Sequence, residues 1–397
     1  GRSFVGGRRA LYRARPMSSM PNTAAPEEPG EVHPERPPRA LARGGWSRAA
    51  GLLGLVVVAV GVAALSIAIG TRSIAPSDVL DALVRFDPLN DDHLIVRDLR
   101  VPRTILAFAV GGALGLAGGV MQGVTRNPLA DPGLLGVNAG AALAVVVGII
   151  AFDVTGVSGQ VWFAFVGAAV AGVLVYSIGA MGRGGATPVK LAIAGAAMAA
   201  LMGSITSALL LLDSATLDQY RFWAVGSVAN RDLDVFGPAL PFLALGAGLA
   251  LASSRSLNGL ALGEDVARSL GQRVGWSRAV AAASVVLLCG GATASAGPIW
   301  FVGLTVPHVA RALTGPDHRW LLPYSMVLGA VLLTGADVIG RVIARPGELE
   351  VGVGDRGEVL RRVHGDVGPP EASPADPPAV GVLLLDLFED GERLLRL

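Results

Sequence analysis

Apolar stretches of about membrane length recur along this chain and constrain its fold more than any other feature. A helix needs about 20 mainly apolar residues to cross a bilayer, and lipid-facing backbone must satisfy its own hydrogen bonds. The sequence therefore predicts an all-α, polytopic membrane bundle of nine spans. They lie near Ala49 to Ile69, Thr104 to Met121, Leu134 to Phe152, Val161 to Met181, Val189 to Leu212, Phe236 to Ser253, Arg278 to Ala296, Trp300 to Leu313 and Leu321 to Ile343.

Composition supports a membrane fold and excludes several function classes. Hydrophobic residues make up 52% of the chain and charged residues only 16%, which is too apolar for a soluble surface. The net charge of +1 gives no reason to expect nucleic acid as a partner. Lys190 is the only lysine, so a nucleotide-binding P-loop is excluded. Cys289, the only cysteine, lies in an apolar run and is interpreted as a packing residue.

The two ends of the chain differ from the apolar middle. Residues 1–48 are rich in Pro, Arg, Glu and Gly and are expected to be a disordered cytoplasmic extension, with Met17 or Met20 as candidate starts. Residues 49–353 form the predicted membrane domain. Residues 354–397 are charged and Pro-rich, so we expect a poorly ordered tail.

The distribution of basic residues in short loops predicts the topology. If the N-terminus is cytoplasmic, the inner loops hold Arg126, Arg183, Lys190, Arg255, Arg268, Arg273 and Arg319, which agrees with the positive-inside rule. The outer segment 71–103 breaks this rule because it carries five arginines, partly balanced by six aspartates. A functional role for some of these arginines would explain the exception.

The segment 99–143 holds the most informative motifs. Arg100-Val-Pro-Arg103 puts two guanidinium groups at the mouth of a predicted span, where they suit carboxylates of a partner protein. Snorkelling of the two side chains to the membrane interface is the alternative. Residues 127–133, Asn-Pro-Leu-Ala-Asp-Pro-Gly, predict a non-helical link between two spans. Such backbone lies against protein or a water-filled path, and a plain tight turn is the alternative.

These motifs and several later ones resemble the FecCD family, the permeases of ABC importers for ferric siderophores, haem and cobalamin. The resemblance covers roughly residues 49–353. The later motifs, in the family's order, are LALGEDVARSLGQRV at 260–274, AGPIWFVGLTVPHVARALTGPDHR at 296–319, GADVIGR at 335–341 and PGELEVGV at 346–353.

The resemblance implies three sets of site residues. A short helix that couples to the ATPase corresponds to Gly263, Glu264, Asp265, Ala267, Arg268, Ser269, Leu270 and Gly271. An arginine pocket that docks the substrate-binding protein corresponds to Arg100, Arg103 and Arg341. Positions that narrow the pathway on the cytoplasmic side correspond to Asn127, Leu129, Thr187 and Pro188.

Two ionisable residues in predicted spans need separate interpretation. His308 has no second ligand at metal-binding spacing within the spans, so no metal site is predicted, and His308 is expected to serve helix packing. Asp337 is expensive in a bilayer unless it is paired. Arg341 lies one helical turn further on, so an i, i+4 ion pair is predicted.

The C-terminal end departs from the family pattern. Relatives continue after the Glu-Leu-x-Val-Gly-Val motif with a tenth span, whereas no run after Val353 reaches membrane length here. A one-base change of reading frame is one hypothesis, and a regulatory tail is the other. The tenth span helps to line the pathway in relatives, so its loss bears directly on transport competence.

The resulting functional hypothesis is the permease subunit of a binding-protein-dependent ABC importer for ferric siderophore-type chelates, with haem or cobalamin as alternative cargo. The chain is not an enzyme, and it binds no cofactor, because ATP and Mg²⁺ belong to a partner subunit. The implied partners are the lipid bilayer of a bacterial inner membrane, a second permease (identical or related), two ATPase subunits and an external binding protein. An ion-coupled carrier or a non-transporting truncated copy is the alternative of another class.

Overall fold

The computed structural model describes residues 45–70, 72–154, 156–182, 187–229 and 233–343. Their regular secondary structure is helical throughout. The elements in the first half are α1 (Gly45–Ala68), α2 (Pro76–Val84), α3 (Asp91–Leu94), η1 (Ile95–Arg100), α4 (Val101–Thr125), η2 (Pro132–Leu135), α5 (Val137–Phe152), α6 (Val157–Ala180) and α7 (Pro188–Leu212). Those in the second half are α8 (Ser214–Ala224), α9 (Leu233–Phe236), η3 (Gly237–Ala239), α10 (Leu240–Ala252), α11 (Ser254–Ala261), α12 (Glu264–Ser269), α13 (Val274–Ala296), α14 (Val302–Thr314) and α15 (His318–Ile343).

Each of the nine predicted spans falls on a helix of the structure, which confirms the all-α membrane fold. Within the described ranges, six helices are long and apolar enough to cross a membrane, or seven if the bent pair α10–α11 counts as one span. Helices α5 and α14 are shorter, with 16 and 13 residues. The count of nine spans is therefore not confirmed.

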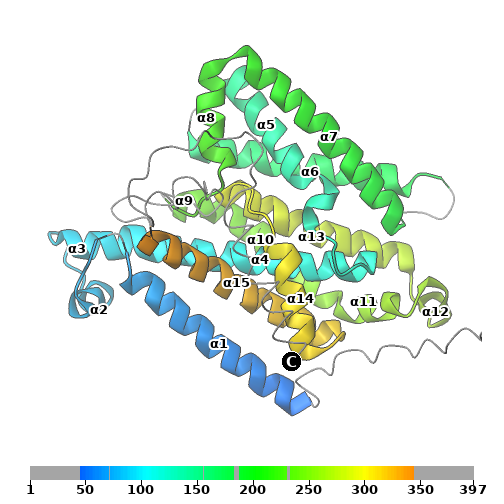
Figure 1. Cartoon of the computed structure of the whole chain (residues 1–397), viewed down its shortest axis with the longest axis horizontal. Coiled ribbons are helices and arrows are strands. Elements are labelled where there is room, and N and C mark those ends of the chain that lie inside the picture. Colours follow the sequence, from blue (N-terminus) through cyan, green and yellow to red (C-terminus); the bar gives the residue numbers. More distant parts are fainter. Residues whose placement is uncertain (1–44, 71, 155, 183–186, 230–232, 344–397) are drawn as a thin grey trace, which may run out of the picture. The chain divides into compact units, whose positions relative to one another are not determined.

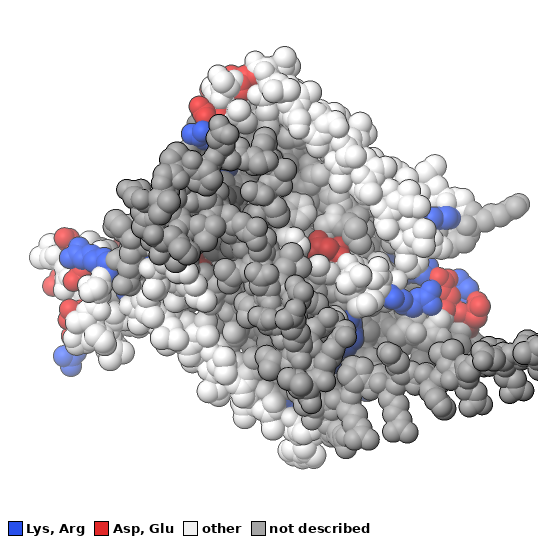
Figure 2. All heavy atoms as spheres, in the orientation of Figure 1, with Lys and Arg blue, Asp and Glu red and all other residues white. Residues whose placement is uncertain are grey.

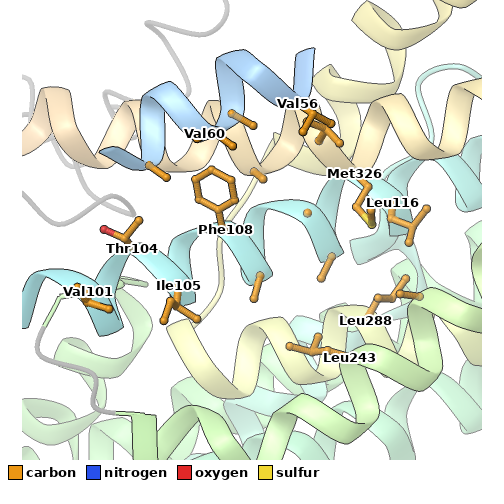
Figure 3. Close-up of a pocket in the computed structure, with 18 of the residues that line it drawn as sticks. Val56, Val60, Val101, Thr104, Ile105, Phe108, Leu116, Leu243, Leu288 and Met326 are labelled. Carbon is orange, nitrogen blue, oxygen red and sulfur yellow. The ribbon is translucent and has the colours of Figure 1, made fainter. Parts of the chain in front are cut away.

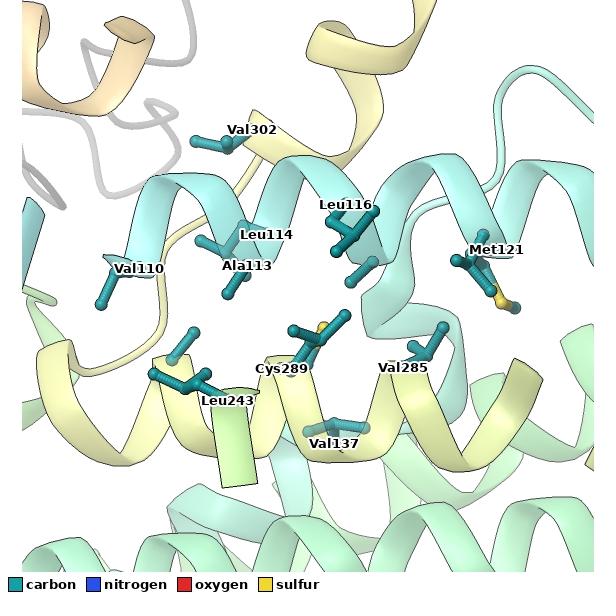
Figure 4. Packing of buried hydrophobic residues seen from close by; sticks show 14 of the residues in the cluster. Val110, Ala113, Leu114, Leu116, Met121, Val137, Leu243, Val285, Cys289 and Val302 are labelled. Atoms are coloured by element: carbon teal, nitrogen blue, oxygen red, sulfur yellow. The ribbon is translucent and has the colours of Figure 1, made fainter. Parts of the chain in front are cut away.

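Helix α4 is the central element of the bundle. It packs against α15, α13 and α14, and Figure 1 shows it running between α13 and α15. All but a few of its residues are buried. Figure 4 shows Cys289 of α13 pointing toward α4 among Ala113 and Leu116, so its interpretation as a packing residue is confirmed.

Glycines set the distance between α4 and its neighbours. A Cβ at Gly118 would overlap the carbonyl oxygen of Gly303 in α14, and one at Gly111 would overlap the carbonyl oxygen of Gly329 in α15. Helix association in a bilayer gains little from the hydrophobic effect, so it relies on close van der Waals packing of small residues. The run GGALGLAGG on α4 supplies that packing.

Helices α5, α6 and α7 form a second group, with α6 and α5 lying against α13. Helix α7 is the outermost of the three in Figure 1, and only 17% of its most apolar window is buried. Figure 2 shows charged side chains gathered over α2–α3 at one end of the visible surface and over α12 at another, with a further cluster over α8. We refer to the first two of these regions as the α2–α3 end and the α12 end.

A largely apolar groove of about 690 Å³ opens beside α4, between α1 and α15 on one side and α10 and α13 on the other. Figure 3 shows Val56 and Val60 of α1 and Phe108 of α4 on its wall, with Leu243 and Leu288 opposite. The groove separates α1 from α10, so α1 is attached to the bundle chiefly through α15.

The structure contains elements that the sequence did not predict, and some predicted segments lie outside the described residues. Helix α2 was expected as loop, but it packs Val79 and Ala82 against Val96. Helix α1 begins at Gly45, inside the segment expected to be disordered. Residues 1–44 and 344–397, with the motif at 346–353 and the tail, lie outside the described residues.

Replacing Gly118 with Ala is predicted to destabilise the bundle, because the new methyl group overlaps the Gly303 carbonyl. Overpacking of this kind costs about 1–3 kcal/mol. Gly61→Ala on α1 is the matched control, because nothing lies within 4 Å of its Cβ position. Thermal unfolding of the purified protein in detergent measures both. A melting temperature for Gly118→Ala equal to that of the control would contradict the packing account.

Candidate functional site

The segment predicted to couple to an ATPase forms a separate helical turn, α12, at one end of the bundle. Gly263 (φ 106°) and Gly271 (φ 82°) flank it with backbone conformations that favour glycine. Ala267 is fully buried. Val266 and Leu270 on the same turn are 44% and 69% exposed. The turn therefore presents apolar side chains outward.

Acidic and basic groups fix α12 to the bundle. Glu264 accepts hydrogen bonds from Arg278 of α13 at 2.5 Å and from Arg268 at 2.8 Å. The hydrogen bond and charge of Arg278, with the charge of Arg268, hold the pKa of Glu264 below its usual range against the opposing effect of partial burial. Asp265 also pairs with Arg268, at 3.1 Å, but its side chain is 99% exposed. Glu264 is thus the residue that anchors the turn, since the Arg278 side chain is only 5% exposed.

A glutamine strengthens this attachment. The side chain amide of Gln272 donates to the backbone oxygen of Ser256 in α11 at 2.9 Å and to the hydroxyl of Ser277 in α13 at 3.0 Å. Helices α11, α12 and the start of α13 are therefore tied into one unit.

The three arginines predicted to dock a binding protein lie together at the α2–α3 end, where they are buried. Arg103 of α4 and Arg341 of α15 both bind the carboxylate of Asp337, at 2.8 and 2.9 Å. The predicted i, i+4 pair of Asp337 and Arg341 is confirmed. Its second partner, Arg103, was not predicted. A buried carboxylate shared by two guanidinium groups is the arrangement in which a charge is tolerated inside a protein.

The same arginines hold the end of α1. Arg100 donates to the backbone oxygens of Ile67 and Ala68, at 3.0 and 2.7 Å. Arg341 donates to the backbone oxygen and the hydroxyl of Ser66. Cationic groups at a helix C-terminus satisfy its unpaired carbonyl groups and its dipole. These arginines therefore attach α1 to α4 and α15, and their docking role stays a prediction.

The predicted pathway residues lie on two irregular segments. Arg126 (φ 52°) ends α4, and the backbone N–H of Leu129 donates to the side chain of Asn127 at 2.9 Å, so the non-helical link is confirmed. Leu129 is 72% exposed. Thr187 caps α7 by accepting from the N–H of Lys190, and Pro188 occupies the first turn. The gating role of these residues stays a prediction.

A pocket of about 320 Å³ lies where the link at residues 127–133 meets a second break, between α13 and α14, which the predicted spans placed between Ala296 and Trp300. The second break follows α13 at residues 297–301, where Phe301 has a strained positive φ of 68°. The pocket is lined by Asp131 from one break, Trp300 and Phe301 from the other, Asn138 at the start of α5 and small residues of α7. Paired irregular segments from the two halves of a chain are a recurring feature of transporter binding sites. The Gly-Pro pair at 297–298 was the signal for the second break.

The structure also bears on the two roles considered for His308, helix packing and metal binding. His308 is exposed on α14, so it is not the packing residue that was expected. The buried histidine of this region is His318, at the start of α15. Among the described residues, no group of three potential metal ligands is found.

Comparison with known proteins identifies relatives over most of the chain. The model of the FecCD transport family matches residues 56–354. The ferric enterobactin transport system permease protein FepD of Escherichia coli K12 is 46% identical over 307 residues, which cover 77% of this chain and 91% of that protein. The probable siderophore transport system permease protein YfiZ of Bacillus subtilis 168 is 42% identical over 302 residues, or 76% and 90%.

A solved structure shares the fold. The chain superposes with a TM-score of 0.67 and 27% identity on an inward-facing conformation of a metal-chelate type ABC transporter. The match covers 77% of this chain and 94% of that one.

Glu264→Gln is predicted to lower stability, because it leaves the buried Arg278 without its carboxylate. A hydrogen bond to a charged group contributes about 1.5–3 kcal/mol. Because the folded pKa of Glu264 lies below the unfolded value of about 4.3, its stabilisation is present above pH ~4.3. It is lost as the pH falls through the folded pKa. Chemical unfolding at pH 7 and at acidic pH measures this difference.

Asp265→Asn is the matched control, being the same acid-to-amide change at the next residue. The side chain of Asp265 is almost fully exposed, so its loss is expected to cost no more than about 0.5 kcal/mol. Equal destabilisation by the two substitutions at pH 7 would refute the anchoring role of Glu264.

Proposed function

The chain belongs to the FecCD transport family, and from this premise we propose that it is the permease subunit of a binding-protein-dependent ABC importer for ferric siderophores. It is a multi-pass membrane protein and a transport component rather than an enzyme. The observation that carries the proposal is α12, a short turn fixed to the bundle by Glu264 and Gln272 while its apolar side chains face outward.

The siderophore cargo is inferred from the relatives. FepD is named for ferric enterobactin transport, YfiZ for siderophore transport and another relative, FhuB of Bacillus subtilis, for import of iron(3+)-hydroxamate. A cobalamin import permease of Halobacterium salinarum is also related, at 37% identity over 64% of this chain. Ferric siderophore is therefore the first choice and cobalamin or haem the second.

We further propose that the N-terminus is cytoplasmic. This orientation puts α12 on the cytoplasmic side and the α2–α3 end outside. It agrees with the basic residues of the short inner loops. Two ATPase subunits would then act on two permease subunits from the α12 side, and a loaded binding protein would approach the other side.

Movement of cargo requires the bundle to alternate between states open to either side. Closure of the ATPase subunits on ATP would push α12, and the bundle would tilt as a body. The pathway would run between two permeases. The surface of α7 is suited to line it, because little of this helix is buried within the chain. The pocket at Asp131 is suited as well, because residues of α7 form part of its lining.

An ion-coupled carrier is the alternative of another class, and it needs carboxylates that gain and lose protons within the spans. Asp337 does not suit that task, because arginines already bind both oxygens of its carboxylate. A truncated copy that does not transport is distinguished by the uptake experiment below.

Leu270→Asp is predicted to abolish co-purification of the ATPase subunit, because it puts a charge in the apolar contact surface of α12. The control is Leu89→Asp, which changes a still more exposed leucine at the α2–α3 end. Pull-down of the ATPase with each tagged permease tests this. Retention of the ATPase by Leu270→Asp would remove α12 as the docking surface.

The docking role of the arginines is proposed from their location at the α2–α3 end, and it predicts opposite effects of two substitutions. Arg103→Gln should weaken binding of the substrate-binding protein, because a positive charge is removed. Asp337→Asn should strengthen it at low salt, because the neutralising carboxylate is removed. Titration of permease in nanodiscs measures both affinities. If both substitutions weaken binding of the substrate-binding protein equally and lower the melting temperature equally, the arginines have a structural role only.

Transport itself is tested in cells whose only copy of this permease is either the chain as given or a version with an apolar tenth span restored. We expect radiolabelled iron from a ferric siderophore to enter cells that carry the restored version and the cognate ATPase. Uptake by the given chain as well would show that the tail is tolerated. If neither version imports ferric siderophore, haem or cobalamin while FepD does so in its own strain, the import function is wrong.

A further inference from the structure

Helices α11 and α12 and the start of α13 form one hydrogen-bonded unit, which we refer to as the coupling unit. Asn258 of α11 joins this unit to the start of α15. Its side chain nitrogen donates to a carboxylate oxygen of Asp317 at 2.6 Å. Its side chain oxygen accepts from the backbone N–H of His318 at 2.9 Å and lies 2.8 Å from the Nδ1 atom of the His318 ring. The orientation of the amide is fixed, because a carboxylate can only accept and a backbone N–H can only donate.

From this contact we propose that Asn258 is a positioning residue that transmits displacement of α12 to α15 during transport. The inference rests on the proposed importer function and adds a residue to it. Helix α15 would then act as the lever that connects the ATPase side of the bundle with the arginine cluster on the other side.

Asn258 holds the end of a helix rather than a loose side chain. The backbone oxygen of Asp317 accepts from the N–H groups of Trp320 and Leu321, and its carboxylate accepts from that of Arg319. Partial burial opposes ionisation, but the hydrogen bonds from Asn258 and Arg319 hold the pKa of Asp317 below its usual range. A charged acceptor makes the contact with Asn258 stronger than one between neutral groups.

The far end of α15 has the contacts that a lever requires. The helix has 26 residues, so it is about 39 Å long at 1.5 Å per residue. Near its other end Asp337 binds Arg103 of α4, and Arg341 binds the end of α1 at Ser66. A shift of α15 that starts at Asn258 therefore reaches α4 and α1 at the opposite end of the bundle.

A second route leaves the coupling unit toward α13, through Glu264 with Arg278 and through Gln272 with Ser277. This route does not involve Asn258. Loss of Asn258 alone should therefore leave α12 in place and the ATPase bound. What it should remove is the set of hydrogen bonds that connects α11 to the start of α15.

The test uses the complete transporter, with permease, ATPase and binding protein, in proteoliposomes. For Asn258→Ala we expect ATP hydrolysis to continue while iron transported per ATP falls about tenfold or more, within the 5–150-fold range typical of coupling between sites. Ser256→Ala is the control on the same helix, because its hydroxyl bonds only to Ser253 within that region. Ser256→Ala should leave the amount of iron transported per ATP unchanged.

A charge exchange provides the decisive comparison. Asn258→Asp alone puts a second carboxylate against that of Asp317, and the repulsion should uncouple the transporter more strongly than Asn258→Ala does. Combining it with Asp317→Asn restores a carboxylate–amide pair in reverse and should recover transport per ATP. This double variant also keeps the test informative if a single variant fails to fold.

Two results would overturn the inference. One is a lowered melting temperature in Asn258→Ala with an unchanged ratio of iron to ATP, which reduces Asn258 to a stabilising cap. The other is a double variant that regains stability but not coupling. If the unaltered transporter shows no ATP-dependent uptake at all, the proposed function fails, and the role of Asn258 fails with it.

Discussion

The close approach of α4 to α14 and α15 determines the rest of this structure. Glycines on both sides of the contact bring backbone against backbone, and no larger residue fits at Gly111 or Gly118. Because lipid is as apolar as the side chains, this packing must supply much of the stability that a soluble protein gains from burial in water. Once α15 lies along α4, Asp337 is within reach of Arg103, and α1 is held through the same group of residues.

Polar contacts are concentrated at the two ends of this apolar core. At the α2–α3 end a buried carboxylate shared by two arginines joins α4, α15 and, through backbone oxygens, α1. At the α12 end Glu264 joins α12 to α13, Gln272 joins α11 to α13, and Asn258 joins α11 to the start of α15. Such contacts are directional, whereas apolar packing is not, so they are suited to fix how the ends move relative to the core.

The sequence predicted what depends on local pattern. Span positions follow from apolar length, the turn α12 from its two glycines, and the pair of Asp337 with Arg341 from helical spacing. Partners far apart in the chain could not be predicted this way. Arg103 and Asp337 are 234 residues apart, and Asn258 and Asp317 are 59 apart. Their contacts exist only after the helices pack, and single-residue properties do not encode that arrangement. Helix α2 was missed because it is only nine residues long and its first residues, Pro76, Ser77 and Asp78, are typical of a loop.

The central claim is that force from an ATPase enters at α12 and drives cargo from the α2–α3 end to the other side. Proteoliposomes test it most directly, with permease and ATPase in the membrane, iron-loaded binding protein outside and ATP either enclosed or absent. The account predicts accumulation of radiolabelled ferric siderophore only with enclosed ATP and loaded binding protein. Accumulation driven by an ion gradient without ATP would contradict it.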